Sequence, residues 1–262
     1  MKQLLSFSLF CSAMAVAPLA YSSTIVVPSG STFDSMTFDA ATDEGNSNES
    51  TSLGGTPNTV QVVFNASVLQ AGGLQVGDVL NGLAFRIGGG PSTRRPAPNF
   101  TVNNYVIRLS TSLNSAGNLN DTFALNRGTD FTEVRSGALT FNAADYDDSN
   151  NGVGEGPNDF GPAITFNNTF TYQGGDLLLE YTHNLNTEVD TTAMTSEADA
   201  LNNLNGVQTL FGEGFDATER GFGDNGSDVG FAPVVQFSVI PEPSTGILSG
   251  MGLLGLLLRR RR

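Results

Sequence analysis

The chain has 262 residues, and its 26 acidic side chains outnumber its 12 basic ones, which gives a formal net charge of −14. Between residues 23 and 240 there are 25 acidic residues, seven arginines and no lysine, so this middle region carries a net charge of −18. Such acidity excludes nucleic-acid binding, which requires a basic patch. The single cysteine is Cys11, so the middle region has no disulfide, no thiolate nucleophile and no cysteine-bound zinc.

The N-terminus has the order of a secretory signal peptide. Lys2 supplies a positive charge, a mainly apolar run covers residues 4–19, and Ala20-Tyr21-Ser22 places small residues at a cleavage site. The run is too short and too interrupted for a transmembrane helix, which needs about 20 apolar residues. We predict a signal peptide at residues 1–22, against the alternative of a buried first helix or strand.

In the middle region, apolar residues recur at every second position, as Val235, Phe237 and Val239 do. Such alternation buries one face of a strand and leaves the other in water, which is typical of antiparallel sheets. Many short strands between Gly-, Asn- and Asp-rich turns predict one all-β domain, an antiparallel β-sandwich or jelly roll. The only helix expected is a short one at residues 195–204, capped by Thr195 or Ser196. The main strands are expected at residues 24–27, 60–64, 83–87, 105–109, 131–134, 138–141, 163–166, 177–181 and 235–239.

An acidic loop within the predicted sheet is a candidate calcium site. Residues 147–152 read Asp-Asp-Ser-Asn-Asn-Gly, which matches the first half of a calcium loop with alternating oxygen ligands and a glycine at the sharp turn. Asn158 occupies the place of the bidentate glutamate of an EF-hand, so the loop is not an EF-hand. Asp and Asn also favour turns that hold no ion, and that interpretation stays open. The candidate ligands are Asp147, Ser149 and Asn151, with Asp145 or Asp159 completing the shell.

The residue pattern does not predict catalysis. His183 is the only histidine and no Gly-x-Ser-x-Gly motif accompanies it, so an ordinary histidine at a strand end is the preferred interpretation. Among 25 acidic residues, some pairs meet the carboxylate spacing of a glycosidase by chance, as Glu155 would with Asp159 or Glu180. The chain also has no tryptophan to form a flat platform for sugars. We expect a non-enzymatic protein.

The C-terminus has three consecutive parts. Pro241-Glu242-Pro243 is stiff and extended, because each proline locks φ and disfavours a helical residue before it. Residues 246–258 are apolar and would form a helix of about 20 Å, which is short for a hydrocarbon core of about 30 Å. A basic end then stops transfer and remains in the cytoplasm, so membrane contact is expected to be transient. The stop-transfer residues are Arg259, Arg260, Arg261 and Arg262.

This C-terminus resembles the PEP-CTERM sorting signal, which exosortases recognise in Gram-negative bacteria that make exopolysaccharide. The resemblance rests on the Pro-Glu-Pro motif, the apolar segment and the terminal arginines, in that order and behind a signal peptide. It implies that a membrane-bound exosortase cuts near Pro241-Glu242-Pro243 and passes the protein to the cell surface or matrix. The alternative is an ordinary C-terminal anchor, which needs the same apolar run and basic stop.

The stretch from Tyr105 to Tyr181 is similar to a recurrent ectodomain of PEP-CTERM proteins. The resemblance implies an all-β fold and an exported location, and it assigns no activity. It is carried by an ordered series of short motifs at residues 107–111, 126–128, 135–139, 156–160 and 175–180.

Three parts are therefore expected: a signal peptide (1–22), a β-sandwich ectodomain (23–239) and a PEP-CTERM sorting signal (240–262). The expected function is that of a structural or adhesive protein of the cell surface or biofilm matrix, associated with exopolysaccharide. It would reach its place through an intermediate anchored briefly in the inner membrane. The export translocon and an exosortase are the expected partners, and calcium is the candidate cofactor. The alternatives are a carbohydrate-binding module of the matrix and, ranked last, a secreted glycan hydrolase that uses carboxylates.

Overall fold

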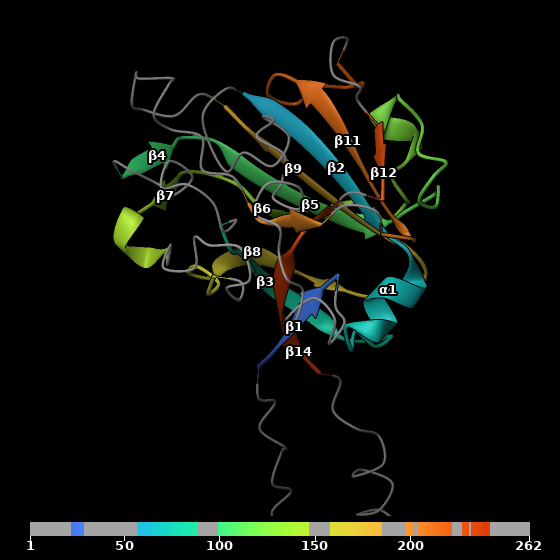
Figure 1. Ribbon diagram of the computed structural model, residues 1–262, viewed down its shortest axis with the longest axis horizontal. Coiled ribbons are helices and arrows are strands. Elements are labelled where there is room, and N and C mark those ends of the chain that lie inside the picture. The colour runs from blue at the N-terminus through green and yellow to red at the C-terminus, as the bar shows by residue number, and fades with distance from the viewer. Residues whose placement is uncertain are drawn as a thin grey trace, which may run out of the picture. The chain divides into compact units, whose positions relative to one another are not determined.

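The alternating segments of the sequence form two antiparallel sheets in the computed structural model of the chain (Figure 1). All residues that the structure describes belong to one compact unit. These are residues 22–28, 57–87, 99–146, 158–184, 198–201, 204–221, 227–230 and 232–241.

A six-stranded sheet forms one layer of this unit (Figure 1). Its central strands pair along their whole length, with Asn58 opposite His183 and Phe64 opposite Leu177. All neighbouring strands in the sheet are antiparallel. In spatial order the strands are β12 (Ser227–Val229), β11 (Val207–Glu213), β2 (Asn58–Phe64), β9 (Leu177–His183), β5 (Tyr105–Thr111) and β6 (Thr132–Arg135).

A four-stranded antiparallel sheet forms the second layer and pairs the first strand of the chain with the last. The last strand is an inner strand of this sheet, because it pairs with the first strand on one side and with β3 on the other. In spatial order the strands are β1 (Ser23–Val27), β14 (Val235–Ile240), β3 (Val79–Phe85) and β8 (Ile164–Thr171).

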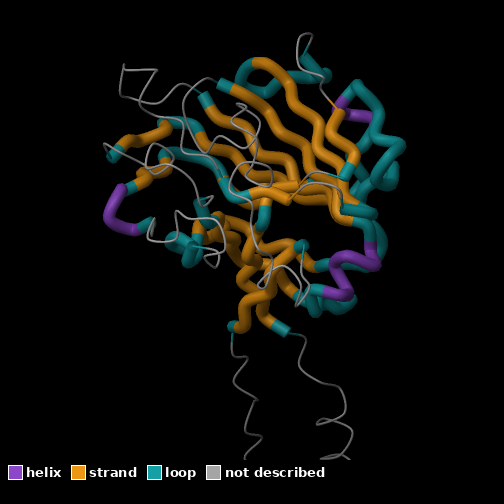
Figure 2. Tube along the Cα trace, in the orientation of Figure 1, coloured by secondary structure: helices purple, strands orange, loops and turns teal. Residues whose placement is uncertain are grey.

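Short elements lie around the two sheets, and helical turns contribute little to the described structure (Figure 2). Two small ladders pair β4 (Phe100–Val102) with β7 (Leu139–Phe141), and β10 (Ala200–Leu201) with β13 (Ala232–Pro233). The helical segments are α1 (Ala66–Ala71) and the 3-10 turns η2 (Phe123–Leu125) and η3 (Ala143–Asp145).

One apolar core fills the space between the sheets. The six-stranded sheet contributes residues such as Val62 and Tyr181, and the four-stranded sheet contributes Phe85 and Phe237, all at most 1% exposed. The rings of Phe85 and Tyr181 meet edge to face across the core, with centroids 5.7 Å apart. Burial of each such side chain contributes about 1.5–3 kcal/mol, so the packing between the layers is the main source of stability.

The expected fold class is confirmed, and each of the nine strand segments expected from alternation overlaps a strand of the structure. Strand β11 was missed because its residues Val207 to Gly212 are buried on both faces and its sequence does not alternate cleanly. Helix α1 was also missed. It is one short turn of helix between β2 and β3, and Leu69 is its only fully buried residue.

The expectation that the second face of each strand lies in water is wrong for the centre of the six-stranded sheet. Every residue of β2 and β9 is buried, including the polar Gln61, Glu180 and Thr182. Two loops, residues 112–131 and 214–221, make contacts with this outer face through hydrogen bonds to Gln61 and Thr59. Alternation reports which face is apolar, but a polar face can still be covered when its groups are hydrogen-bonded.

The prediction of a helix at residues 195–204 is also wrong for the described residues 198–201. Ala198 forms a β-bridge with Ile87, and Ala200–Leu201 is strand β10. The Asp199 side chain pairs with Arg86, and the Asp199 amide donates to the Arg86 carbonyl. A tertiary ion pair and a strand pairing therefore outweigh the weak local preference for helix.

Candidate functional site

The two ends of the folded body lie side by side in the four-stranded sheet (Figure 1). Strand β1 begins at Ser23, directly after the expected signal-peptide cleavage site, and Ser23 is the register partner of Val239 in β14. Directly paired residues of antiparallel strands have Cα atoms about 4.5–5.5 Å apart. The beginning and the end of the folded body therefore leave the sheet at one place.

Strand β14 ends at Ile240 and is followed by the exposed Pro241. Proline has no amide hydrogen to continue a ladder, which explains why the strand ends there. The remaining tail residues expected to matter lie outside the described residues: Glu242, Pro243, the apolar segment 246–258, Arg259, Arg260, Arg261 and Arg262.

Residues 239–262 match the family model of the PEP-CTERM protein-sorting motif. This chain carries a PEP-CTERM sorting motif. The match begins inside β14 and includes all of the tail residues predicted from the sequence, so the resemblance stated for the C-terminus is confirmed. No curated protein and no solved structure matches the chain.

The PEP-CTERM motif supports an exported protein that is sorted by an exosortase. In the part of the chain that the structure describes, none of the helices has the length and apolar character needed to span a bilayer. The predicted signal peptide and the predicted apolar tail segment lie outside that part.

The candidate calcium loop is described only at its two ends. Asp145 and Asp159 are both exposed. The side-chain amide of Asn142 donates a hydrogen bond of 2.9 Å to an Asp145 carboxylate oxygen. Gly161 lies against the Tyr146 ring, which brings the two ends of the loop together. Asp147, Ser149 and Asn151 lie outside the described residues, so their assignment stays a prediction. Among the described residues, no group of three or more His, Cys, Asp or Glu side chains is placed to hold a metal.

The most concentrated charge cluster that the described structure contains surrounds Glu180 of β9, on the outer face of the six-stranded sheet. Its carboxylate is fully buried and accepts two hydrogen bonds of 2.9 Å from Arg127 and one of 3.0 Å from Arg108. Gln61 of β2 donates a further bond of 2.7 Å. Arg108 also donates to Asp216 at 2.8 Å. Burial acts to lower the pKa of Arg108, but the hydrogen bonds to Asp216 and Glu180 raise it overall.

A chain of amides continues from this cluster into the covering loop. The Gln61 oxygen accepts a bond of 2.9 Å from the buried Asn126, and the Asn126 oxygen accepts bonds from Asn114 and from the Asn120 amide. The Arg127 guanidinium lies over the Phe131 ring, 4.5 Å from its centroid. The cluster therefore holds residues 112–131 against the sheet. Both Glu180 oxygens accept hydrogen bonds from arginine or glutamine, and the Glu180 side chain has no exposed surface.

A second buried ion pair holds a covering segment on the four-stranded sheet. Arg86, directly after β3, donates to Asp199 at 2.6 Å, and both side chains are at most 4% exposed. The Arg86 guanidinium also lies over the Phe160 ring, 5.3 Å from its centroid. The Val234 amide donates to the Asp199 carbonyl at 2.7 Å. Both sheets therefore use an arginine–carboxylate pair to hold a covering segment, and only the Arg86–Asp199 pair is buried on both sides.

His183 is a core residue at the end of β9. Its side chain is fully buried and its ring stacks on Tyr105 at 5.9 Å with an interplanar angle of 4°. Its Nδ1 atom lies 3.1 Å from the Asn184 carbonyl oxygen. These contacts agree with the interpretation as a strand-end histidine.

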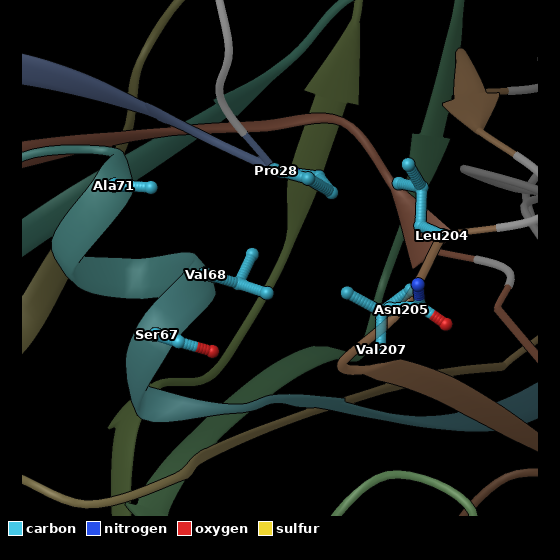
Figure 3. A pocket seen from close by; sticks show the side chains of 7 residues that line it. All are labelled: Pro28, Ser67, Val68, Ala71, Leu204, Asn205 and Val207. Atoms are coloured by element: carbon cyan, nitrogen blue, oxygen red, sulfur yellow. The ribbon is translucent and has the colours of Figure 1, made fainter.

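A small pocket of about 200 Å³ opens beside α1 (Figure 3). Residues of α1 lie on one side of it, residues before and within β11 on the other, and Pro28 at its edge (Figure 3). None of its described lining residues is charged, so the pocket offers mainly apolar contact. The residues are Pro28, Ser67, Val68, Ala71, Leu204, Asn205 and Val207.

Sequence reasoning missed the Glu180 cluster because it treated Glu180 as part of a wet strand face. Arg108, Arg127 and Glu180 belong to three different motifs of the series that carries the ectodomain resemblance. An ordered series that contains three arginines and a glutamate was a usable indication of an ion cluster. Their separation of up to 72 residues hid it, because only strand pairing and the covering loop bring them together.

Proposed function

We propose that this chain is a non-enzymatic structural or adhesive protein of the cell surface or extracellular matrix, released into place when an exosortase removes its C-terminal tail. The observation that carries the proposal is the PEP-CTERM motif, which starts at the last strand of a folded body. The pairing of β1 with β14 supports it further, because it places the two ends of the folded body, where the signal peptide and the sorting tail are joined to it in sequence, next to each other.

The buried polar groups support a structural role for the body. The charge clusters around Glu180 and around Arg86 hold covering segments on the sheets. A carbohydrate-binding module is less well supported, because sugars are commonly bound on exposed aromatic rings. Phe215, at 38%, is the one aromatic residue among the large exposed hydrophobic side chains of the described chain.

The test of sorting is intact-mass measurement and cell fractionation of protein from the native host. We expect the mature protein at the surface or in the medium, without the signal peptide and without the segment after about Pro243. Replacement of Pro241, Glu242 and Pro243 by alanine should retain the tail and keep the protein in the membrane fraction. The matched control is Glu219→Ala, at an exposed acidic residue outside the motif. A mature protein that still ends at Arg262 contradicts the proposal.

The test of the body's role is a glycan array with the mature protein, together with assays for polysaccharide turnover. We expect neither turnover nor saturable binding to a defined sugar. Saturable binding that survives washing would replace the structural proposal with the carbohydrate-binding one. Turnover that a single Glu or Asp substitution abolishes would replace it with the hydrolase.

A further inference from the structure

Strand β14 is held by the sheet on both of its edges. Thr24 pairs with Ser238 in the β1 ladder, and Val79 pairs with Ile240 in the β3 ladder. The core-facing side chains of β14, Val235, Phe237 and Val239, are at most 1% exposed. Removing β14 from the sheet would therefore break two ladders and expose three core side chains.

The sorting motif overlaps this strand. Its match starts at residue 239, so Val239 and Ile240 belong both to the motif and to the sheet. Pro241 is the first residue beyond the ladder and is exposed. Only five residues separate Ile240 from the apolar segment that begins at Gly246, and fully extended they span about 17 Å.

A protease that reads an extended peptide does so through free main-chain donors and acceptors, in the manner of an added strand. The main-chain groups of β14 are already used by β1 and β3. An enzyme that needed residues before Pro241 in its groove would first have to extract β14. Pro241, the next residue, lies outside both ladders and is exposed.

We propose that the tail is removed from a body that has already folded, with β14 still paired between β1 and β3, so that the sheet sets Ile240 as the upstream limit of cleavage. This inference rests on the proposed exosortase processing and specifies the state of the substrate. The C-terminal strand is thus protected by the fold up to Ile240, and the exposed Pro241 is the first residue outside the ladder.

A disulfide between β1 and β14 tests the proposal directly. The mature region has no cysteine, so the double variant Thr24→Cys/Ser238→Cys introduces the only two thiols. The two positions are register partners, and the Cα separation of such pairs, about 4.5–5.5 Å, fits a disulfide. Neither side chain is buried, so the core is unchanged. Exported proteins meet oxidising conditions in which the bond can form.

The full-length double variant is expressed in the native host beside the wild type and the two single-cysteine variants. Free-thiol labelling and non-reducing electrophoresis report the disulfide, and intact mass reports the tail. We expect the cross-linked protein to lose its tail to the same extent as the controls, with a mature C-terminus at Ile240 or beyond it.

Each other outcome has a defined meaning. Cross-linked protein that retains its tail, while the single-cysteine controls lose theirs, overturns the proposal because β14 must then be extracted for cleavage. A double variant that is processed but never forms the disulfide also overturns it, since β1 and β14 are then not paired in the exported substrate. A mature C-terminus at or before Val239 contradicts the limit. Tail retention in the wild type as well contradicts the proposed function itself.

Discussion

At the scale of single residues, the buried carboxylate of Glu180 is the most demanding feature of the body. A charge taken out of water is stable only when partners satisfy it, and here Arg108, Arg127 and Gln61 do so. The arginines come from β5 and from the covering loop, so one side chain ties two strands to that loop.

We predict that Glu180→Gln destabilises the mature protein. Removing one partner of a buried ion pair costs about 3–5 kcal/mol. The loss here should lie toward the lower end of that range, because Arg108 and Arg127 are partly exposed. The measurement is urea unfolding followed by circular dichroism. The matched control is Glu133→Gln, whose side chain is 47% exposed and lies 3.7 Å from Arg108. It should change stability by no more than about 1 kcal/mol. Equal effects of the two variants would contradict the assignment.

Of the four buried tyrosines in the described chain, Tyr105 and Tyr181 have no exposed surface, and they limit the stability of the folded body at alkaline pH. Burial raises the pKa of Tyr105 well above its ordinary value of 10.0, and burial also raises the pKa of Tyr181. In the unfolded chain these groups lose their protons near pH 10, while the folded protein keeps them. The folded state then binds more protons, so its stability is unaffected below that pH and decreases as the pH rises above it.

We therefore predict that ionisation of Tyr105 and Tyr181 coincides with unfolding. Ultraviolet absorbance of tyrosinate and circular dichroism are measured together during an alkaline titration of the mature protein. Complete ionisation of its tyrosines near pH 10 without loss of the β-sheet spectrum would show that these two side chains are not buried.

At the scale of elements, the decisive feature is the loop that covers the outer face of the six-stranded sheet. Phe123 of η2 is fully buried, and its ring lies close to Gly212 of β11, where an added Cβ would come within 2.9 Å of it. Its carbonyl accepts a bond of 3.2 Å from Gln61. This short turn therefore supplies the apolar part of the cover, and the Glu180 cluster supplies the polar part.

We predict that Phe123→Ala costs about 3–5 kcal/mol, the range for truncating a buried phenylalanine. Leu125→Ala in the same turn is the control, because Leu125 is 55% exposed and its change should stay within about 0.5 kcal/mol. Denaturant unfolding of both variants gives the comparison. A negligible effect of Phe123→Ala would mean that the outer face is open to water, as alternation alone had indicated.

At the scale of the whole molecule, the excess of acidic residues is the dominant property. The net charge of −18 between residues 23 and 240 creates self-repulsion that destabilises a compact state. The described arginines are largely committed to internal pairs with Asp199, Glu180 and Asp216. A divalent cation from outside the cell would relieve part of this repulsion.

We predict that millimolar calcium stabilises the mature protein and raises its unfolding temperature. At a calcium concentration ten times the dissociation constant, the free energy of unfolding should increase by about 1.4 kcal/mol. Asp147→Ala should abolish the shift, whereas Asp121→Ala, at a residue 64% exposed beside Arg220, should not. Magnesium separates site binding from charge screening, because it prefers a stricter octahedral shell. A shift that magnesium reproduces, or that Asp147→Ala leaves unchanged, rules out this loop as the site.

The sequence by itself determined the features that depend on local order. Period-two alternation in segments such as residues 177–181 and 235–239 marks strands, because successive side chains of a strand point to opposite faces. The sorting motif is likewise a linear feature, read from Pro241-Glu242-Pro243 and the residues after it. Neither depends on what the rest of the chain packs against.

Only the tertiary structure decided which polar faces are covered and where the ends of the body meet. Glu180 has the same place in an alternating strand as a solvated glutamate, and it is buried because Arg127, 53 residues away, returns to it on a loop. Segment 198–201 is extended because Asp199 finds Arg86, 113 residues away. Ser23 and Val239 become neighbours through a strand pairing between the two ends of the body. Such contacts join residues far apart in the chain, and no local pattern contains them.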